Sequence, residues 1–168
     1  MLNKENNIKN QIFIALLFLF LIVFDQTTKI FISKTMIENV FTDRNVLPFL
    51  NIVFVRNTGI SFGFFSEGGI FGRYFFSTFS ILVGSSIFLI SIFSEKKIVA
   101  IALSSIAAGA FGNAIDRIYF GGVIDFIDIF IYNYHWPAFN FADFFITVGV
   151  FVLLFDSFIY DEKKIKRY

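Results

Sequence analysis

Two aspartates in apolar surroundings are the residues of this sequence best suited to chemistry. Asp125 stands in Val-Ile-Asp-Phe and Asp143 in Phe-Ala-Asp-Phe. Two carboxylates held close together do not both ionise easily, so one keeps its proton at neutral pH. The ionised partner can then take a proton from water while the protonated one polarises a carbonyl, as in aspartic proteases. The same pair could carry protons instead, so a small proton-coupled membrane transporter or channel subunit is the alternative.

The lack of cysteine and the scarcity of histidine limit the kinds of catalysis and metal binding that this chain can perform. The chain of 168 residues has no cysteine and a single histidine, His135. These counts exclude disulfides, thiolate catalysis and Cys-ligated metals, and one histidine does not build a metal cluster or a Ser-His triad alone. The carboxylate pair is therefore expected to act without a metal or other cofactor. The formal net charge of +1 gives no reason to expect nucleic acid as a partner.

The composition predicts that lipid is the solvent of these residues. Hydrophobic residues make up 57% of the chain and charged residues only 16%, whereas a soluble domain is about half apolar and about a quarter charged. Apolar stretches of about 20 residues predict a membrane all-α bundle of four transmembrane helices. The predicted spans are residues 12–32, 74–93, 98–115 and 144–160, within a single domain of residues 1–168.

Basic residues predict how the spans are oriented. Lysines cluster in the amino-terminal segment, in the loop around Lys96 and in the carboxyl-terminal tail. The positive-inside rule places these segments, and both termini, in the cytoplasm. The longer loops, residues 33–73 and 116–143, then face outward. Within the first of them, residues 51–65 (NIVFVRNTGISFGFF) surround an Asn-Thr-Gly turn with β-branched and aromatic residues, which predicts a short β-hairpin or cradle on the outer surface.

Polar residues, which are energetically unfavourable inside a membrane, lie close together near the outer face of this predicted bundle. Ionisable groups in a membrane usually mark function, and those at the outer ends of the first, third and fourth spans come to one level near the outer face. A separation of four residues puts Asp25 and Lys29 on one helix face, where a structural ion pair is expected. The convergent residues are Asp25, Lys29, Asn113, Asp116, Arg117, Asp125, Asn140 and Asp143.

Four further ionisable residues are expected to have supporting or solvent-facing positions. Asp116 is expected to hold a neighbouring side chain or backbone group in place. Asp128 and His135, in the second outer loop, are expected to be solvated or interfacial. Asp156 is near the cytoplasmic end of the fourth span and is expected to be structural.

Four blocks of the sequence resemble the lipoprotein signal peptidase family, also called signal peptidase II. They are DQTTK (25–29), RNTGISFG (56–63), GNAIDRIYFGGVIDFI (112–127) and FNFAD (139–143). Each block alone is a weak signal, but the four occur in the expected order over nearly the whole chain. The resemblance implies four transmembrane helices with a small extracytoplasmic β-cradle and a short helix at the outer surface. It also implies an aspartic endopeptidase of the bacterial cytoplasmic (inner) membrane, with its active site near the outer face.

The resemblance further implies a substrate and the roles of individual residues. Asp125 and Asp143 would be the catalytic pair that removes the signal peptide from diacylglyceryl-modified prolipoproteins, on the amino side of the lipidated cysteine. Lipid-modified precursors and membrane lipids are the expected partners of a monomer. The family commonly has a small polar residue, usually serine, where this chain has Phe144. The residues implied to bind substrate or support the pair are Asn57, Gly59, Asn113, Arg117, Asn140, Asp25 and Lys29.

Overall fold

The computed structural model describes residues 2–38, 43–59 and 69–165, which form four long helices and an antiparallel sheet. The helices are α1 (Leu2–Glu38), α2 (Gly69–Phe93), α3 (Lys97–Phe120) and α4 (Phe141–Ile165). Each contains a stretch long and apolar enough to cross a membrane, which confirms the predicted four-helix fold. Helices suit these stretches because a backbone in hydrocarbon must satisfy its own N–H and C=O groups.

The helices extend beyond the apolar stretches that predict them. The third apolar stretch ends at residue 115, but α3 continues to Phe120 through Asp116 and Arg117. Gly121 then ends the helix at φ 75°, and its N–H donates to the carbonyl of Arg117. Glycine suits this left-handed capping position because it has no Cβ. Hydropathy therefore locates the spans but underestimates the length of the helices.

Helix α3 lies at the centre of the bundle and contacts α1, α2 and α4. Small residues permit this packing, as is common between membrane helices. Ala107, Ala108 and Ala114 are fully buried. Gly109 has no room for a Cβ because the backbone carbonyl of Ala142, at the start of α4, lies against it. This close approach brings the first turn of α4 next to the polar end of α3.

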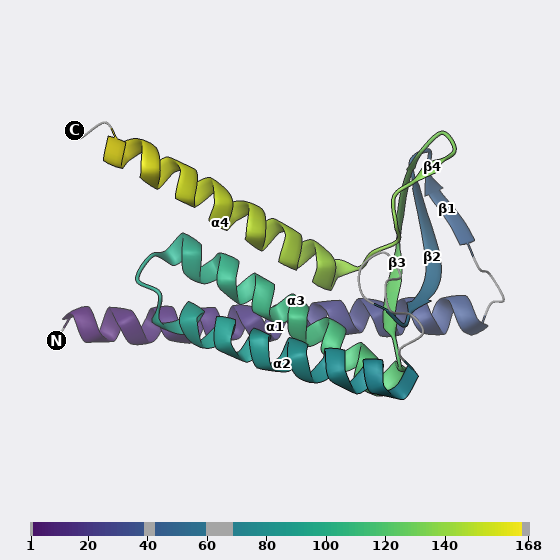
Figure 1. Ribbon diagram of the computed structural model, residues 1–168, viewed down its shortest axis with the longest axis horizontal. Coiled ribbons are helices and arrows are strands. Elements are labelled where there is room, and N and C mark those ends of the chain that lie inside the picture. The colour runs from purple at the N-terminus through teal and green to yellow at the C-terminus, as the bar shows by residue number, and fades with distance from the viewer. Residues whose placement is uncertain (1, 39–42, 60–68, 166–168) are drawn as a thin grey trace.

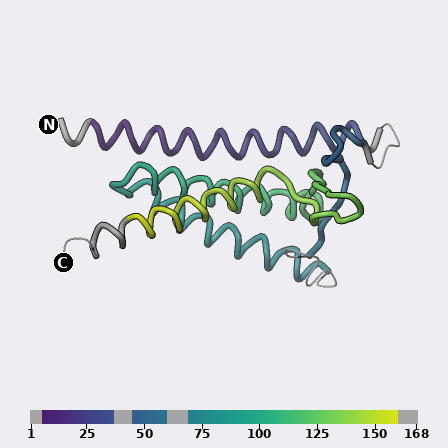
Figure 2. Tube along the Cα trace, turned by 90° about the horizontal axis from the view of Figure 1, so that it is seen from above, coloured from purple at the N-terminus to yellow at the C-terminus, as the bar shows by residue number. Residues whose placement is uncertain are grey.

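A small sheet crosses one end of the bundle. Its strands are β1 (Asp43–Leu47), β2 (Leu50–Asn57), β3 (Val123–Ile131) and β4 (Tyr134–His135), all antiparallel and in the order β1-β2-β3-β4. Figure 1 shows the strands running crosswise to the helices, with both chain termini at the opposite end of the bundle. Figure 2 shows from above that the two termini lie at the end of the bundle opposite the strands.

The predicted hairpin is only partly described. Residues 51–57 belong to β2, as expected for a strand in this segment, and its neighbours are β1 and β3. Residues 60–65 of the predicted hairpin lie outside the described residues, as do residues 60–63 of the RNTGISFG block. Between the four long helices, the described residues 43–59 and 121–140 contain strands and turns but no helix, so the short surface helix that the resemblance implies is not found there.

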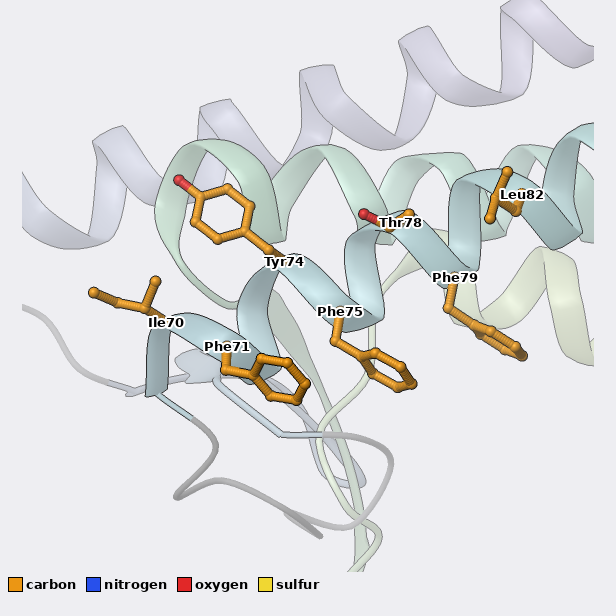
Figure 3. A pocket seen from close by; sticks show the side chains of 7 residues that line it. All are labelled: Ile70, Phe71, Tyr74, Phe75, Thr78, Phe79 and Leu82. Carbon is orange, nitrogen blue, oxygen red and sulfur yellow. The ribbon is translucent and has the colours of Figure 1, made fainter.

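Large apolar side chains cover the outside of the helices. Figure 3 shows Phe71, Phe75 and Phe79 along one face of α2, where they are exposed. Their rings stack at centroid distances of 5.9 and 6.5 Å. Such a surface is stable where lipid covers it, because the hydrocarbon chains take the place of water. The open concavity of about 780 Å³ on this face is lined by Ile70, Phe71, Tyr74, Phe75, Thr78, Phe79 and Leu82.

Candidate active site

Asp125 and Asp143 lie where the sheet meets α3 and α4. Asp125 is on β3, opposite Val55 of β2, and is only 3% exposed. Asp143 is in the first turn of α4. Asn140 connects them, because its Nδ2 donates to Asp125 Oδ1 (2.7 Å) and its backbone N–H donates to Asp143 Oδ2 (3.2 Å). The two aspartates that the sequence singled out therefore share one hydrogen-bonding neighbour.

The start of α4 explains how Asp143 is held. Asn140 Oδ1 accepts a hydrogen bond from the Asp143 backbone N–H (3.0 Å), while Asp143 Oδ2 accepts one from the Asn140 N–H (3.2 Å). This reciprocal pattern is a capping box, which satisfies two N–H groups left free at a helix start. The spacing Asn-x-x-Asp in FNFAD thus fixes both the first turn of α4 and the orientation of the Asp143 carboxylate.

Burial gives Asp125 an unusual affinity for its proton. Burial is the main cause, and the negative charge of Asp143 adds to it, so that the pKa of Asp125 rises to about 7. Hydrogen bonds from Asn57 and Asn140 and the charge of Lys29 act in the opposite direction but are smaller. Because the two carboxylates interact, the titration belongs to the pair. The raised pKa therefore favours retention of the Asp125 proton up to near neutral pH.

Asn113 links Asp143 to the buried interior of the bundle. Its Nδ2 donates to Asp143 Oδ1 at 2.8 Å. Its Oδ1 accepts hydrogen bonds from Lys29 Nζ (3.1 Å) and from Asn140 Nδ2 (3.2 Å). The two donors on the oxygen fix which way the Asn113 amide faces. Asn113 therefore presents a donor to Asp143 and lies with Asn140 between the two carboxylates.

Three more predicted site residues lie on the β2 side of Asp125. Asn57, the last residue of β2, donates from Nδ2 to Asp125 Oδ2 at 3.3 Å. The Asn57 Oδ1 accepts the N–H of Gly59 (3.1 Å), and the Gly59 carbonyl accepts from Arg117 Nη2 (3.1 Å). Arg117 Nη1 also donates to the Asn113 carbonyl at 3.3 Å. Asn57, Gly59 and Arg117 thus form a connected rim beside Asp125.

A buried ion cluster supports the site from α1 and α3. The ammonium of Lys29 is 2.8 Å from Asp25 Oδ2 and 2.8 Å from Asp116 Oδ2, and all three side chains are fully buried. The expected Asp25–Lys29 ion pair is confirmed, with Asp116 as a second partner. Gln26 Nε2 also bridges the two carboxylates, at 3.1 Å from Asp25 Oδ2 and 2.9 Å from Asp116 Oδ1. Gln26 was not among the residues predicted for the site, although a polar residue inside an apolar span was a signal for a role there.

The two carboxylates of this cluster also bind the backbone beside the aspartate pair. Asp25 Oδ1 accepts the N–H of Ala142 (2.9 Å), the residue before Asp143. Asp116 Oδ2 accepts the N–H of Ile124 (3.1 Å), the residue before Asp125. The expectation that Asp116 holds a neighbouring group is confirmed by this bond. Because Lys29 binds both carboxylates, one buried cation ties together the chain segments that carry Asp125 and Asp143.

Four residues outside this cluster were also singled out from the sequence. Asp128, expected to be solvated or interfacial, is not solvated: it is 7% exposed, accepts from Asn51 Nδ2 (2.9 Å) and lies 2.9 Å from His135 Nδ1. His135 is exposed, as expected. Asp156 forms an ion pair with Lys96 away from the site, in keeping with a structural role. The Phe144 side chain is half exposed beside Phe145, and its backbone N–H continues the first turn of α4.

Fold and site together define a membrane-embedded protein of several helices with an aspartate pair at one end of the bundle. A family model described as signal peptidase (SPase) II matches residues 17–159. This chain belongs to the signal peptidase II family and is therefore a membrane peptidase. The relatives found give no support to the transporter alternative.

The similarity extends over most of the chain in sequence and in structure. A lipoprotein signal peptidase of Pelagibacter ubique (strain HTCC1062) is 39% identical over 160 residues, which cover 94% of this chain and 95% of that relative. One from Acinetobacter baumannii (strain SDF) is 41% identical over 148 residues, 87% of this chain and 83% of the relative. A solved structure described as a bacterial membrane enzyme is 32% identical, has a TM-score of 0.72 and covers 90% of each chain.

Proposed function

We propose that this enzyme removes the signal peptide from diacylglyceryl-modified bacterial prolipoproteins, with Asp125 and Asp143 as its catalytic pair. The cut falls on the amino side of the lipidated cysteine. The observation that carries this proposal is the aspartate pair bridged by Asn140, in a chain of the signal peptidase II family. The family membership supports the substrate class, and the raised pKa of Asp125 supports the chemistry.

The two aspartates have different tasks in this mechanism. Asp143 accepts hydrogen bonds from Asn113 Nδ2 and the Asn140 N–H, which suits the ionised member of the pair. Its carboxylate takes a proton from a water molecule, and the water oxygen attacks the scissile carbonyl carbon. Protonated Asp125 gives its proton to the carbonyl oxygen as negative charge develops there, and it takes a proton back from that hydroxyl when the C–N bond breaks. The proton on Asp143 then passes to the amide nitrogen as the C–N bond breaks.

The rim beside Asp125 is proposed to bind the substrate backbone. Asn57 and Gly59 continue from the end of β2, and Arg117 approaches them from α3. A guanidinium offers a planar fork of donors that suits peptide carbonyls. A peptide laid along this rim would present its scissile bond to the pair.

The active site is proposed to face the outside of the bacterial inner membrane, with both termini in the cytoplasm. Two features support this orientation. The termini lie at the end of the bundle opposite β3 and the start of α4, which carry the aspartate pair (Figure 1), and basic residues cluster near the termini and between α2 and α3. The lipid chains of a modified cysteine would hold the scissile bond at headgroup depth, close to the ends of the helices.

The substrate class is tested by comparing two forms of one prolipoprotein. Purified enzyme in vesicles is given the precursor with and without the diacylglyceryl group on its cysteine, and release of the signal peptide is followed on gels. The account predicts rapid cleavage of the modified form only, because the lipid positions the bond at the site. Equal cleavage of both forms would contradict the proposed substrate class.

The pH dependence of the reaction follows from the raised pKa of Asp125. Below its pKa of about 7 the side chain keeps the proton that it donates to the carbonyl, and above that pH it loses the proton. The rate constant kcat/KM is therefore expected to fall as the pH rises through the neutral range, with an apparent pKa near 7. A profile measured in vesicles checks this, and a rate that instead rises on the alkaline side would contradict the role of Asp125.

Removal of divalent metal ions is expected to leave the rate unchanged. Water is activated by the carboxylate of Asp143 in this mechanism, and the buried cation beside the site is Lys29. Processing is measured before and after dialysis against a chelator, with a zinc protease as a control for effective chelation. Loss of activity that returns on addition of one metal ion would contradict the mechanism.

A further inference from the structure

The hairpin of β3 and β4 carries exposed aromatic side chains at its tip. Tyr132, Tyr134 and Trp136 are 93%, 84% and 61% exposed, and Ile131 beside them is exposed as well. We call these four residues the aromatic tip. Residues 129–142 contain no Asp, Glu, Lys or Arg. Tyr132 has φ 54°, a left-handed conformation that bulky residues rarely adopt.

The tip lies level with one end of the helices that are long enough to span a membrane. Helices α2 and α3 have 25 and 24 residues, so each is about 36 Å long, slightly more than the hydrocarbon core of about 30 Å. Their ends therefore reach the headgroup region. Figure 1 shows the sheet level with the start of α2 and the end of α3, and the β3–β4 hairpin extending sideways from the bundle at this level.

We propose that the aromatic tip inserts into the headgroup region of the bilayer beside the bundle. Tyrosine and tryptophan favour this region because each ring has an apolar body and one hydrogen-bonding group. The absence of Asp, Glu, Lys and Arg from residues 129–142 suits the same place. Since the hairpin is continuous with the lipid-covered helices, membrane lipid is the occupant that the geometry favours.

The hairpin connects this contact to the proposed catalytic pair. Its base is closed by the Ile127 N–H to Phe139 carbonyl bond (2.8 Å) and the Phe139 N–H to Ile127 carbonyl bond (3.1 Å). Asp125 lies just before this base on β3, and Asn140 follows it directly. Bilayer contact at the tip therefore holds β3, and with it the aspartate pair, at a fixed depth. This second statement rests on the proposed function, whereas the lipid contact does not.

The lipid contact can be measured directly because Trp136 is the only tryptophan of the chain. Native protein without substrate is reconstituted in vesicles of phosphatidylethanolamine and phosphatidylglycerol. Lipids brominated near the headgroup end of the acyl chain should quench Trp136 emission more than lipids brominated near the terminal methyl, and aqueous acrylamide should quench it weakly. Strong acrylamide quenching without bromolipid quenching would overturn the proposal.

A control variant calibrates the depth measurement, and a dilution series tests whether a second copy of the chain covers the tip instead of lipid. Trp136→Phe combined with Leu82→Trp places the tryptophan on the exposed face near the middle of α2, where deep bromines should quench best. For native protein, bromolipid quenching should not change as the protein-to-lipid ratio falls. If the protection of Trp136 from acrylamide disappears on dilution, the tip is covered by a second copy of the chain, and the proposed lipid contact is overturned.

A tip variant tests the connection to the site. Tyr132→Ser with Tyr134→Ser should reduce the shallow bromolipid quenching of Trp136. The ratio of its processing rate to the native rate should be lower in vesicles than in detergent micelles, where no bilayer sets the depth. Reduced quenching with equal ratios in both media would refute the depth effect but leave the lipid contact standing, so the two statements fail separately.

Discussion

Asp125→Asn is expected to abolish signal-peptide processing while the protein stays folded and becomes more stable above neutral pH. Asparagine cannot donate the acidic proton that the carbonyl requires, and loss of general acid–base catalysis costs about 10²- to 10⁴-fold in rate. The amide keeps an oxygen that can accept the hydrogen bond from Asn140 Nδ2, now 2.7 Å from Asp125 Oδ1. The change thus removes the chemistry with little change of shape.

The stability gain has a definite pH dependence. The pKa of Asp125 rises from its ordinary value of 3.8 to about 7 in the folded protein. Between these values the folded state binds more protons than the unfolded state, so the free energy of unfolding of the native chain falls as the pH rises. The variant lacks this slope, so its advantage should grow through this window and stay constant above it.

Thermal unfolding in detergent at several pH values checks this expectation. Asp156→Asn is the matched control, because Asp156 pairs with Lys96 away from the site and should keep full activity. If Asp125→Asn were less stable than the native protein at alkaline pH, Asp125 would not be the buried, proton-holding member of the pair.

Lys29→Met is expected to have the largest effect on folding. Lys29 is fully buried, with its ammonium 2.8 Å from both Asp25 Oδ2 and Asp116 Oδ2. Removal of one partner of a buried ion pair costs about 3–5 kcal/mol, because it leaves uncompensated charge in a medium that solvates it poorly. Methionine has a similar volume, so the cost comes from charge. Activity should fall as well, because both carboxylates bind the backbone beside the proposed catalytic pair.

Two further variants separate charge from shape in this cluster. Lys96→Met removes a lysine of an exposed ion pair with Asp156, which is worth about 0–1 kcal/mol. Lys29→Met combined with Asp25→Asn returns the cluster to a single negative charge and should recover part of the lost stability. Unfolding in detergent is measured for all of them. Equal effects of Lys29→Met and Lys96→Met would show that the cluster does not stabilise the fold.

The apolar stretches were enough to predict the helices but not where they end. The apolar stretch ends at the first charged residues, whereas the helical backbone of α3 continues through Asp116 and Arg117 until Gly121 caps it. The meeting of Asp125 with Asp143 followed from the predicted spans and from the four motif blocks. The register that puts Asp125 opposite Val55 was not predictable, because it depends on a pairing between distant segments.

The supporting contacts were harder to predict than the pair itself. Asn140 and Asp143 are close in sequence, so their capping box has a local signature. The bond between Asp25 and the N–H of Ala142 joins residues 117 positions apart and has no such signature. Asp128 was misassigned for the same reason, since its partner Asn51 lies 77 positions away and only the sheet brings them together.

The central claim is that Asp125 and Asp143 act as one catalytic pair. Its most direct test is a gel-shift processing assay in vesicles with diacylglyceryl-modified prolipoprotein and three proteins: native, Asp125→Asn and Asp143→Asn. The account predicts that the native enzyme releases the signal peptide and that neither variant does, although both fold and bind the precursor. Cleavage by either variant at the native rate would contradict the pair as the source of catalysis.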